Sequence, residues 1–407
     1  MVTLTIVIPA YNEEESIAQI MNRLLAIRGE LAKVGVEDLE LLVVDDGSKD
    51  RTAQIAKEIA ECNEKVWVIN HPSNRGYGAA LKTGFSKATG DLIGFLDADG
   101  TYPPEDLPKL CATALNGWDL VIGSRMTGGD SQMPTIRKLG NKFFAKFITL
   151  LGQQQIADSA SGMRVFHREI LPKIYPLPDG LNLTPIMSTR AIYENIRMIE
   201  IPIPYQERTG NSKLNVMRDG SVYLQSITWT VLSYNPVRIL GLIGSGGIGL
   251  AFLIGLGLVI ARLMGITSLP PWGIVLLFVA LITAVSGISI FALGVTFNYL
   301  VSLFHKRSIR KGLLGKPLLE KPLERHFGWL GILTFILGLS IGIISLILGI
   351  SGWEIDRLWL YLLGSALLIL VGVQLVIYWI LVRVLAELSQ REGLAHDDLM
   401  AIYPTTR

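Results

Sequence analysis

Two kinds of hydrophobic pattern divide the chain. In the first 235 residues, short runs of Val, Ile and Leu alternate with amphipathic segments. The runs predict strands at Leu4–Ile8, Leu39–Val44, Val66–Ile69 and Leu92–Leu96, and the segments between them predict helices at Asn12–Ile27, Thr52–Glu61 and Gly78–Ala88. Because strands that alternate with helices form right-handed βαβ units, we predict an α/β fold with a mostly parallel sheet.

The rest of the chain has a different pattern, with four long stretches that contain no charged residue. A helix needs about 20 apolar residues to cross the hydrocarbon core of a bilayer, and every stretch is long enough. Buried helices of a large soluble domain would not normally lack charge so completely. The sequence therefore predicts an all-α membrane domain of four transmembrane helices, at Ile239–Ala261, Pro271–Phe304, Phe327–Trp353 and Leu358–Val382.

The distribution of charge follows the same division. Residues 1–235 carry 24 Lys+Arg and 27 Asp+Glu, a net charge of −3, whereas residues 236–407 carry 13 and 8, a net charge of +5. This composition excludes a wholly soluble protein, a disordered chain and a nucleic-acid binder driven by bulk positive charge. Cys62 and Cys111 are too few for a disulfide framework and fit a reducing compartment.

Basic residues predict the orientation in the membrane. Seven Lys and Arg residues lie between the second and third spans, and the positive-inside rule places that connection in the cytoplasm. Four spans then place both termini in the cytoplasm, and nothing before the first strand resembles a signal peptide. We expect an α/β domain at 1–213, an interfacial helix at 214–235, spans at 236–304 and 327–385, a basic loop at 305–326 and a cytoplasmic tail at 386–407.

Two segments have the pattern of helices that lie at a bilayer surface. Gly140–Leu151 places aromatic and aliphatic residues on one face with lysines beside it, and Val216–Val231 leads into the first span. Helices that merely cover the sheet would have a similar pattern.

Polar clusters directly follow three of the predicted strands. They are Pro9–Glu13, Asp45–Ser48 and Asp97–Asp99. Ligands of parallel sheets bind outside the carboxyl ends of strands, although acidic residues there also form ordinary turns. The two carboxylates of Asp97-Ala98-Asp99 are hard oxygen ligands of the kind that hold Mg²⁺ or Mn²⁺ together with substrate phosphates.

These motifs resemble the family 2 glycosyltransferases of the GT-A fold, a Rossmann-like α/β fold. Within that family they are similar to the polyprenyl-phosphate branch, the dolichol-phosphate mannose synthases and polyprenyl-phosphate glucosyltransferases. The resemblance covers residues 1–235. It rests on segments 6–13, 43–48, 74–76, 97–100, 121–125, 158–164 and 208–213.

The resemblance implies roles for the matching positions. The nucleotide sugar would be held by Pro9, Tyr11, Glu13, Val44, Asp46, Asp97, Ala98, Asp99, Arg208 and Lys213, and the metal by Asp97 and Asp99. The acceptor phosphate would be bound by Arg125, Arg137, Ser161 and Arg164, since guanidinium groups bind phosphate oxygens in bidentate fashion. The catalytic residues would be Asp158, Asp99 and Arg125.

The role of Asp158 stays open at this point. The resemblance suggests a catalytic base. A phosphomonoester, however, has its second pKa near about 6, so the acceptor oxygen is already largely anionic at cytosolic pH. Asp158 would then orient the acceptor or balance the positive charges.

We therefore hypothesise an inverting, metal-dependent enzyme that transfers a hexose from a nucleotide sugar to dolichyl or another polyprenyl phosphate at the cytoplasmic membrane face. UDP-glucose is favoured over GDP-mannose, because Thr101 stands where mannose synthases commonly have Gln. A homo-oligomer is compatible with this hypothesis, and nucleic acid is not an expected partner. The alternatives are a processive polysaccharide synthase, whose Gln-x-x-Arg-Trp motif is absent, and a non-catalytic membrane scaffold.

Overall fold

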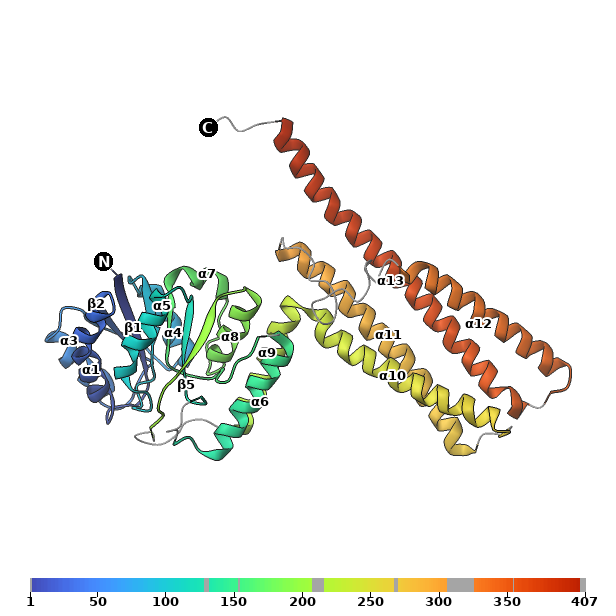
Figure 1. Ribbon diagram of the computed structural model, residues 1–407, viewed down its shortest axis with the longest axis horizontal. Helices are drawn as coiled ribbons and strands as arrows, with labels where there is room; N and C mark the ends of the chain where they lie inside the picture. Colours follow the sequence, from blue (N-terminus) through green and yellow to red (C-terminus); the bar gives the residue numbers. More distant parts are fainter. Residues whose placement is uncertain are drawn as a thin grey trace. The chain divides into compact units, whose positions relative to one another are not determined.

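The computed structural model describes residues 2–127, 132–152, 154–206, 216–266, 270–305, 326–353 and 355–402. The chain forms two compact units, Met1–Thr230 and Val231–Arg407 (Figure 1). The first contains a sheet covered by helices, and the second consists of helices in the part that the structure describes. The predicted α/β fold with an all-α second part is confirmed.

A seven-stranded sheet with the order β3-β2-β1-β4-β6-β5-β7 forms the centre of the first unit. Strands β1 to β4 are parallel to one another, and β5 is parallel to β7. Strand β6 runs antiparallel to β4 and β5. The strands are β1 Val2–Ala10, β2 Val36–Asp45, β3 Val66–Asn70, β4 Leu92–Phe95, β5 Leu120–Ser124, β6 Arg164–His167 and β7 Met198–Pro202.

Helices connect the strands and bury their apolar sides on the sheet. In α1, for example, Ile17, Ile20, Met21 and Leu24 are buried, at the spacing of one helix face. The α-helices of this unit are α1 Ile17–Ala26, α2 Arg28–Lys33, α3 Thr52–Glu61, α4 Tyr77–Lys87, α5 Leu107–Leu115, α6 Thr135–Gly152, α7 Leu171–Ile174, α8 Leu183–Tyr193 and α9 Val216–Tyr234. Helix α9 extends four residues into the second unit. Two 3₁₀ turns, η1 Pro104–Asp106 and η2 Arg168–Ile170, complete the helical elements described in this unit.

The first helix begins later than its sequence pattern predicts. The expected start was Asn12, but Asn12 has a φ of 52°, in the left-handed region that a helix cannot contain. Residues 11–16 instead form a turn-rich loop at the carboxyl end of β1. This loop keeps Tyr11 and Glu13 outside regular structure, where they can face a ligand.

The order of the strands defines where a ligand would bind. The chain passes from β1 to β2, which pairs with one edge of β1, whereas β4 pairs with the other edge. Such a reversal leaves a crevice at the carboxyl ends of the neighbouring strands. All three predicted polar clusters follow these strands, β1, β2 and β4.

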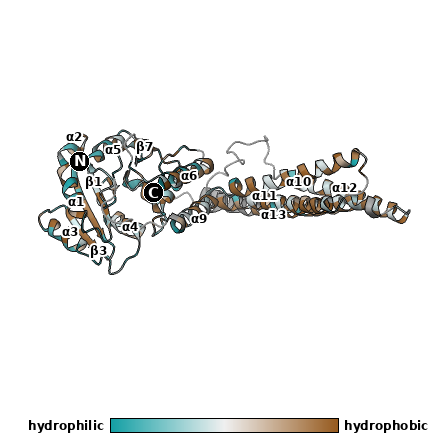
Figure 2. Ribbon diagram, turned by 90° about the horizontal axis from the view of Figure 1, so that it is seen from below, coloured by the Kyte–Doolittle hydropathy of each residue, from teal (hydrophilic) through white to brown (hydrophobic). Residues whose placement is uncertain are grey.

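The second unit contains four helices, among the residues described, that are long and apolar enough to cross a membrane. They are α10 Pro236–Leu263, α11 Pro271–His305, α12 Phe327–Ile350 and α13 Ile355–Ile402. Figure 2 shows hydrophobic residues along these helices. Helix α13 continues through most of the segment that we expected to be a tail, although only Leu358–Leu385 has the composition of a span.

Glycines let the long helices pack closely in pairs. A Cβ atom on Gly244 of α10 would lie 2.6 Å from the Gly287 carbonyl oxygen of α11, and one on Gly331 of α12 would lie 2.9 Å from the Gly372 carbonyl oxygen of α13. Small residues at such crossings allow the van der Waals contact on which helix association in lipid depends.

Candidate active site

A cavity of about 470 Å³ opens at the carboxyl edge of the sheet. The loops after β1, β2 and β4 and Arg125 after β5 supply polar side chains. Helix α6 supplies the apolar Ile136 and Phe144 and the polar Arg137 and Asn141, and α9 supplies Asp219 and Tyr223. Among the residues predicted from the sequence, the cavity is lined by Pro9, Tyr11, Glu13, Asp46, Asp97, Ala98, Asp99, Arg125 and Arg137.

Two carboxylates of the cavity wall follow β4. Asp97 Oδ1 accepts a hydrogen bond of 2.8 Å from the Tyr77 hydroxyl. Burial raises the pKa of Tyr77 well above 10, and the charge of Asp97 adds to this, so the hydroxyl stays protonated as a donor. Asp99 Oδ1 accepts hydrogen bonds from the backbone N–H of Thr101 at 3.1 Å and from its hydroxyl at 2.6 Å. Thr101 therefore orients Asp99 through its side chain.

Asp97 and Asp99 are the residues of this cavity best suited to hold a divalent metal. No group of three or more His, Cys, Asp and Glu side chains at metal-binding spacing occurs in the described part of the chain. Two carboxylates suffice for Mg²⁺ or Mn²⁺, however, because such ions keep several water molecules and take further ligands from substrate phosphates.

Gly162 has no side chain, and the Asp97 carboxylate occupies the space that a Cβ atom there would need. A Cβ atom at this position would overlap the Asp97 carboxylate. We expect Gly162→Ala to displace Asp97 and to lower the rate of sugar transfer roughly 100-fold, the cost of a small misplacement at a reacting centre. Gly29→Ala, where a Cβ atom would meet nothing within 4 Å, is the matched control for a transfer assay. A Gly162→Ala protein with the control's rate would contradict this placement of Asp97.

Asp46 shapes the loop that lines the cavity beside it. Its carboxylate is hydrogen-bonded to His71 Nδ1 at 2.7 Å and accepts from the backbone N–H groups of Arg75 and Gly76 at 2.9 and 2.8 Å. Asp46 thus fixes the 74–76 loop and also borders the cavity. Val44, two residues earlier, is fully buried in β2 and does not line the cavity, and its contact with the nucleotide stays a prediction.

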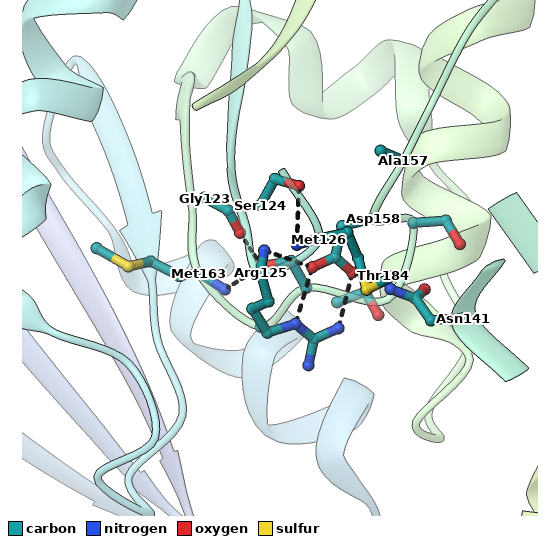
Figure 3. A network of polar contacts seen from close by, with 12 residues as sticks. Gly123, Ser124, Arg125, Met126, Asn141, Ala157, Asp158, Met163 and Thr184 are labelled. Carbon is teal, nitrogen blue, oxygen red and sulfur yellow. Dashed lines mark hydrogen bonds and ion pairs between the residues drawn. The ribbon is translucent and has the colours of Figure 1, made fainter. Parts of the chain in front are cut away.

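Arg125, which lines the cavity, forms a buried ion pair with Asp158 (Figure 3). Asp158 Oδ2 accepts hydrogen bonds from Arg125 N at 2.9 Å and Nε at 2.8 Å, and Oδ1 accepts from Arg125 Nη2 at 2.7 Å. The amide of Asn141 donates a further hydrogen bond of 2.8 Å to Oδ1. Asp158 is fully buried, whereas the guanidinium of Arg125 lines the cavity and lies 5.4 Å from the ring centre of Tyr205.

This arrangement bears on the predicted catalytic role of Asp158. Burial alone would raise the pKa of Asp158, but the charge and hydrogen bonds of Arg125 hold it below its ordinary value. A carboxylate with a lowered pKa that accepts four hydrogen bonds and does not border the cavity is poorly placed to take a proton from a substrate. Its hydrogen bonds hold the Arg125 side chain in place, and its catalytic role stays a prediction.

Arg164 and Ser161 form hydrogen bonds within the protein. Arg164 is fully buried and donates to the carbonyl oxygens of Ser159 and Ser161 and to the Ser188 hydroxyl. Burial lowers the pKa of Arg164 to about 10, so it stays charged at neutral pH. The Ser161 hydroxyl donates to the Gly123 carbonyl oxygen. Neither residue lines the cavity, and their contact with an acceptor phosphate stays a prediction.

Other functional residues lie outside the motifs or outside the described chain. Arg208 and Lys213 are outside the described residues, as is the basic loop at 306–325. The cavity also includes Tyr77, Met133, Ile136, Asn141, Phe144, Leu181, Thr184 and Tyr223, which the motif analysis missed. The amphipathic patterns of Gly140–Leu151 and Val216–Val231 were the only signal for the residues on α6 and α9.

Comparison with known proteins identifies the class. Residues 5–175 match the family model described as glycosyl transferase family 2, and residues 236–396 match a domain of unknown function (DUF8752). Residues 5–175 therefore form a glycosyl transferase family 2 domain, which confirms the family-level resemblance seen in the motifs, whereas membership of the polyprenyl-phosphate branch stays a prediction.

Solved structures that are similar to this chain include glucosyl-3-phosphoglycerate synthase from Mycobacterium tuberculosis. Its complex with Mn²⁺, uridine diphosphate and glucosyl-3-phosphoglycerate is 21% identical over 57% of this chain and 80% of that chain, with a TM-score of 0.44. Its complex with Mn²⁺, UDP-glucose and phosphoglyceric acid is 20% identical over 56% and 80%, with a TM-score of 0.45.

Proposed function

We propose that this glycosyltransferase transfers a hexose from a nucleotide sugar to the phosphate of a polyprenol at a membrane surface. The observation that carries the proposal is the composition of the cavity. The same cavity is lined by the carboxylates of Asp97 and Asp99, by the guanidinium-bearing residues Arg125 and Arg137, and by apolar side chains such as Ile136 and Phe144. These three kinds of group suit a metal-bound diphosphate, an acceptor phosphate and a hydrocarbon chain.

The polar end of the cavity would hold the donor. Asp97 and Asp99 would hold Mg²⁺ or Mn²⁺, which neutralises the diphosphate leaving group when bound. Tyr11, Glu13 and the loop fixed by Asp46 surround the space beside this pair and would hold the base and ribose.

Arg125 and Arg137 would hold the acceptor phosphate close to the donor sugar. An oxygen of that phosphate attacks the anomeric carbon as the bond between this carbon and the diphosphate oxygen breaks. The nucleoside diphosphate leaves with the electron pair, and the configuration inverts. Because a phosphomonoester is largely anionic at neutral pH, the step requires no protein base, which agrees with the enclosed position of Asp158.

The apolar end supports a lipid as the acceptor. Met133, Ile136 and Phe144 contribute apolar side chains to the cavity, and the Tyr223 ring packs 5.6 Å from the Phe144 ring. On the outer surface of α6 and α9, large apolar side chains are exposed, at 70% for Leu139, 84% for Met217 and 65% for Trp229. Such surfaces favour contact with a bilayer interface. The four apolar helices would keep the enzyme at the membrane where a polyprenol is dissolved.

We further propose that the catalytic unit and both termini face the cytoplasm, since the segment between the second and third spans is rich in Lys and Arg. For the donor, we favour UDP-glucose, with GDP-mannose as the second candidate. Thr101 supports this order, because its hydroxyl is hydrogen-bonded to Asp99 where mannose synthases commonly have a longer Gln.

A transfer assay tests the proposal. Membranes that contain the full chain are incubated with radiolabelled UDP-glucose or GDP-mannose, polyprenyl phosphate and Mn²⁺ or Mg²⁺. We expect label to enter the lipid fraction with one donor, and chelation of the metal to abolish it. Label from neither donor in the presence of metal would contradict the proposed reaction, and label from GDP-mannose alone would reverse the donor preference.

A further inference from the structure

Asn141 contacts both the cavity and the buried ion pair, although it belongs to no motif. It lies in the middle of α6, and its side chain is only 6% exposed. Its amide nitrogen lies 2.8 Å from Asp158 Oδ1, and the residue lines the cavity beside Arg125. Figure 3 shows Asp158 between Arg125 on one side and Asn141 on the other.

The chemistry of the contact determines how the amide is oriented. An ionised carboxylate only accepts hydrogen bonds, so Nδ2 must face Asp158. This leaves Asn141 Oδ1 buried without a hydrogen-bond partner in the described part of the chain. A buried acceptor without a partner costs about 1–3 kcal/mol, a cost that an apolar residue at this position would avoid. The donor contact to Asp158 is therefore the feature that accounts for an amide here.

We propose that Asn141 is a positioning residue that holds the Arg125 guanidinium toward the acceptor phosphate by fixing Asp158. The inference rests on the proposed function, in which Arg125 binds that phosphate. Helix α6 also places Ile136, Arg137 and Phe144 on the cavity wall. Helix α6 thus supplies both the apolar surface for the prenyl chain and the Asn141 side chain that orients the phosphate site. Binding of the lipid to α6 is therefore coupled to the position of Arg125.

The groups around Asp158 determine how its charge responds to substitution. Arg125 follows β5 and pairs with it directly, and Arg164 of β6 adds a favourable charge. Glu200 of β7 accepts hydrogen bonds from the backbone N–H of Asp158 and faces it with a like charge. The Tyr102 hydroxyl also interacts with the Asp158 charge. An aspartate in place of Asn141 would therefore add a carboxylate to a buried cluster of charged groups, where little water screens its charge.

The test compares Asn141→Ala and Asn141→Asp in the full chain. Asn141→Ala removes the donor, and we expect transfer to fall about 10- to 100-fold at every pH, with donor affinity unchanged. In Asn141→Asp, the protonated carboxyl group can donate to Asp158 as the amide does, whereas the ionised form repels it. The neighbouring charge raises the pKa of the introduced group. We therefore expect the activity of Asn141→Asp relative to wild type to fall as pH rises between about 5.5 and 8.5, the range in which the raised pKa of the introduced carboxyl group would lie.

Asn22→Ala and Asn22→Asp, on the exposed face of α1, are the matched controls and should follow wild type. Binding of geranyl phosphate, measured by calorimetry, gives a readout independent of turnover, and should weaken about tenfold in Asn141→Ala. Wild-type binding by Asn141→Ala, or a wild-type pH profile for Asn141→Asp, would overturn the proposal. If the wild type binds geranyl phosphate but transfers no sugar, and Asn141→Ala binds weakly, the proposed function fails and the positioning role stands. If the wild type does not bind, both fail.

Discussion

Replacing Asp99 by asparagine is expected to lower the rate of sugar transfer about 1000-fold, the order of loss seen when a charge-stabilising group is removed from an active site. The amide has nearly the same size as the carboxylate, and its oxygen can still accept the two hydrogen bonds from Thr101. The substitution therefore removes one negative charge and one metal ligand while the local structure is kept. A neutral amide oxygen binds Mg²⁺ or Mn²⁺ more weakly, so more metal should be required for the remaining activity.

The measurement is the transfer rate as a function of metal concentration, together with the thermal unfolding midpoint. Glu61→Gln, on the exposed surface of α3, is the matched control, because it also replaces a carboxylate by an amide. We expect the control to keep the wild-type rate and both proteins to keep the wild-type midpoint. An Asp99→Asn protein with an unchanged rate and metal requirement would show that Asp99 is not a metal ligand.

The parts of the site that the sequence predicted correctly are those that depend on strand ends. The apolar run at Leu4–Ile8 and the run at Leu92–Leu96 predict strands that pair in the sheet. Parallel pairing then brings the residues that follow them to one edge, so Tyr11 and Asp99 could be placed near each other without coordinates. Their side chains do line the same cavity.

Contacts that depend on side-chain packing could not be predicted in this way. Arg164 stands in a polar motif, which in a sequence is typical of a ligand contact, yet it is fully buried in β6, where hydrogen bonds to loop carbonyl oxygens satisfy it. Strand β6 itself is only four residues long and begins with this arginine, so no hydrophobic run marked it. Asn141 had no motif at all. Its role follows from its position on a helix face opposite Asp158, 17 residues away.

The buried pair of Arg125 and Asp158 should have the largest effect on stability. The Asp158 side chain is fully buried and that of Arg125 is 12% exposed, so removal of one partner leaves an uncompensated charge in a place with little water. Breaking such a pair costs about 3–5 kcal/mol. We expect Asp158→Leu alone to lower the thermal unfolding midpoint of the full chain strongly and to abolish transfer.

Combining Asp158→Leu with Arg125→Met separates the two roles of the pair. Replacing a whole buried ion pair by apolar residues of similar volume is often neutral or stabilising, so the double variant should recover most of the lost unfolding midpoint. Transfer should stay absent, because the guanidinium that faces the acceptor phosphate is gone. Recovery of stability without activity would mean that the pair exists to present Arg125 to the substrate. A double variant as unstable as the single one would instead mean that the pair chiefly stabilises the fold. The difference between the effect of the double variant on stability and the sum of the two single effects measures the coupling between Arg125 and Asp158.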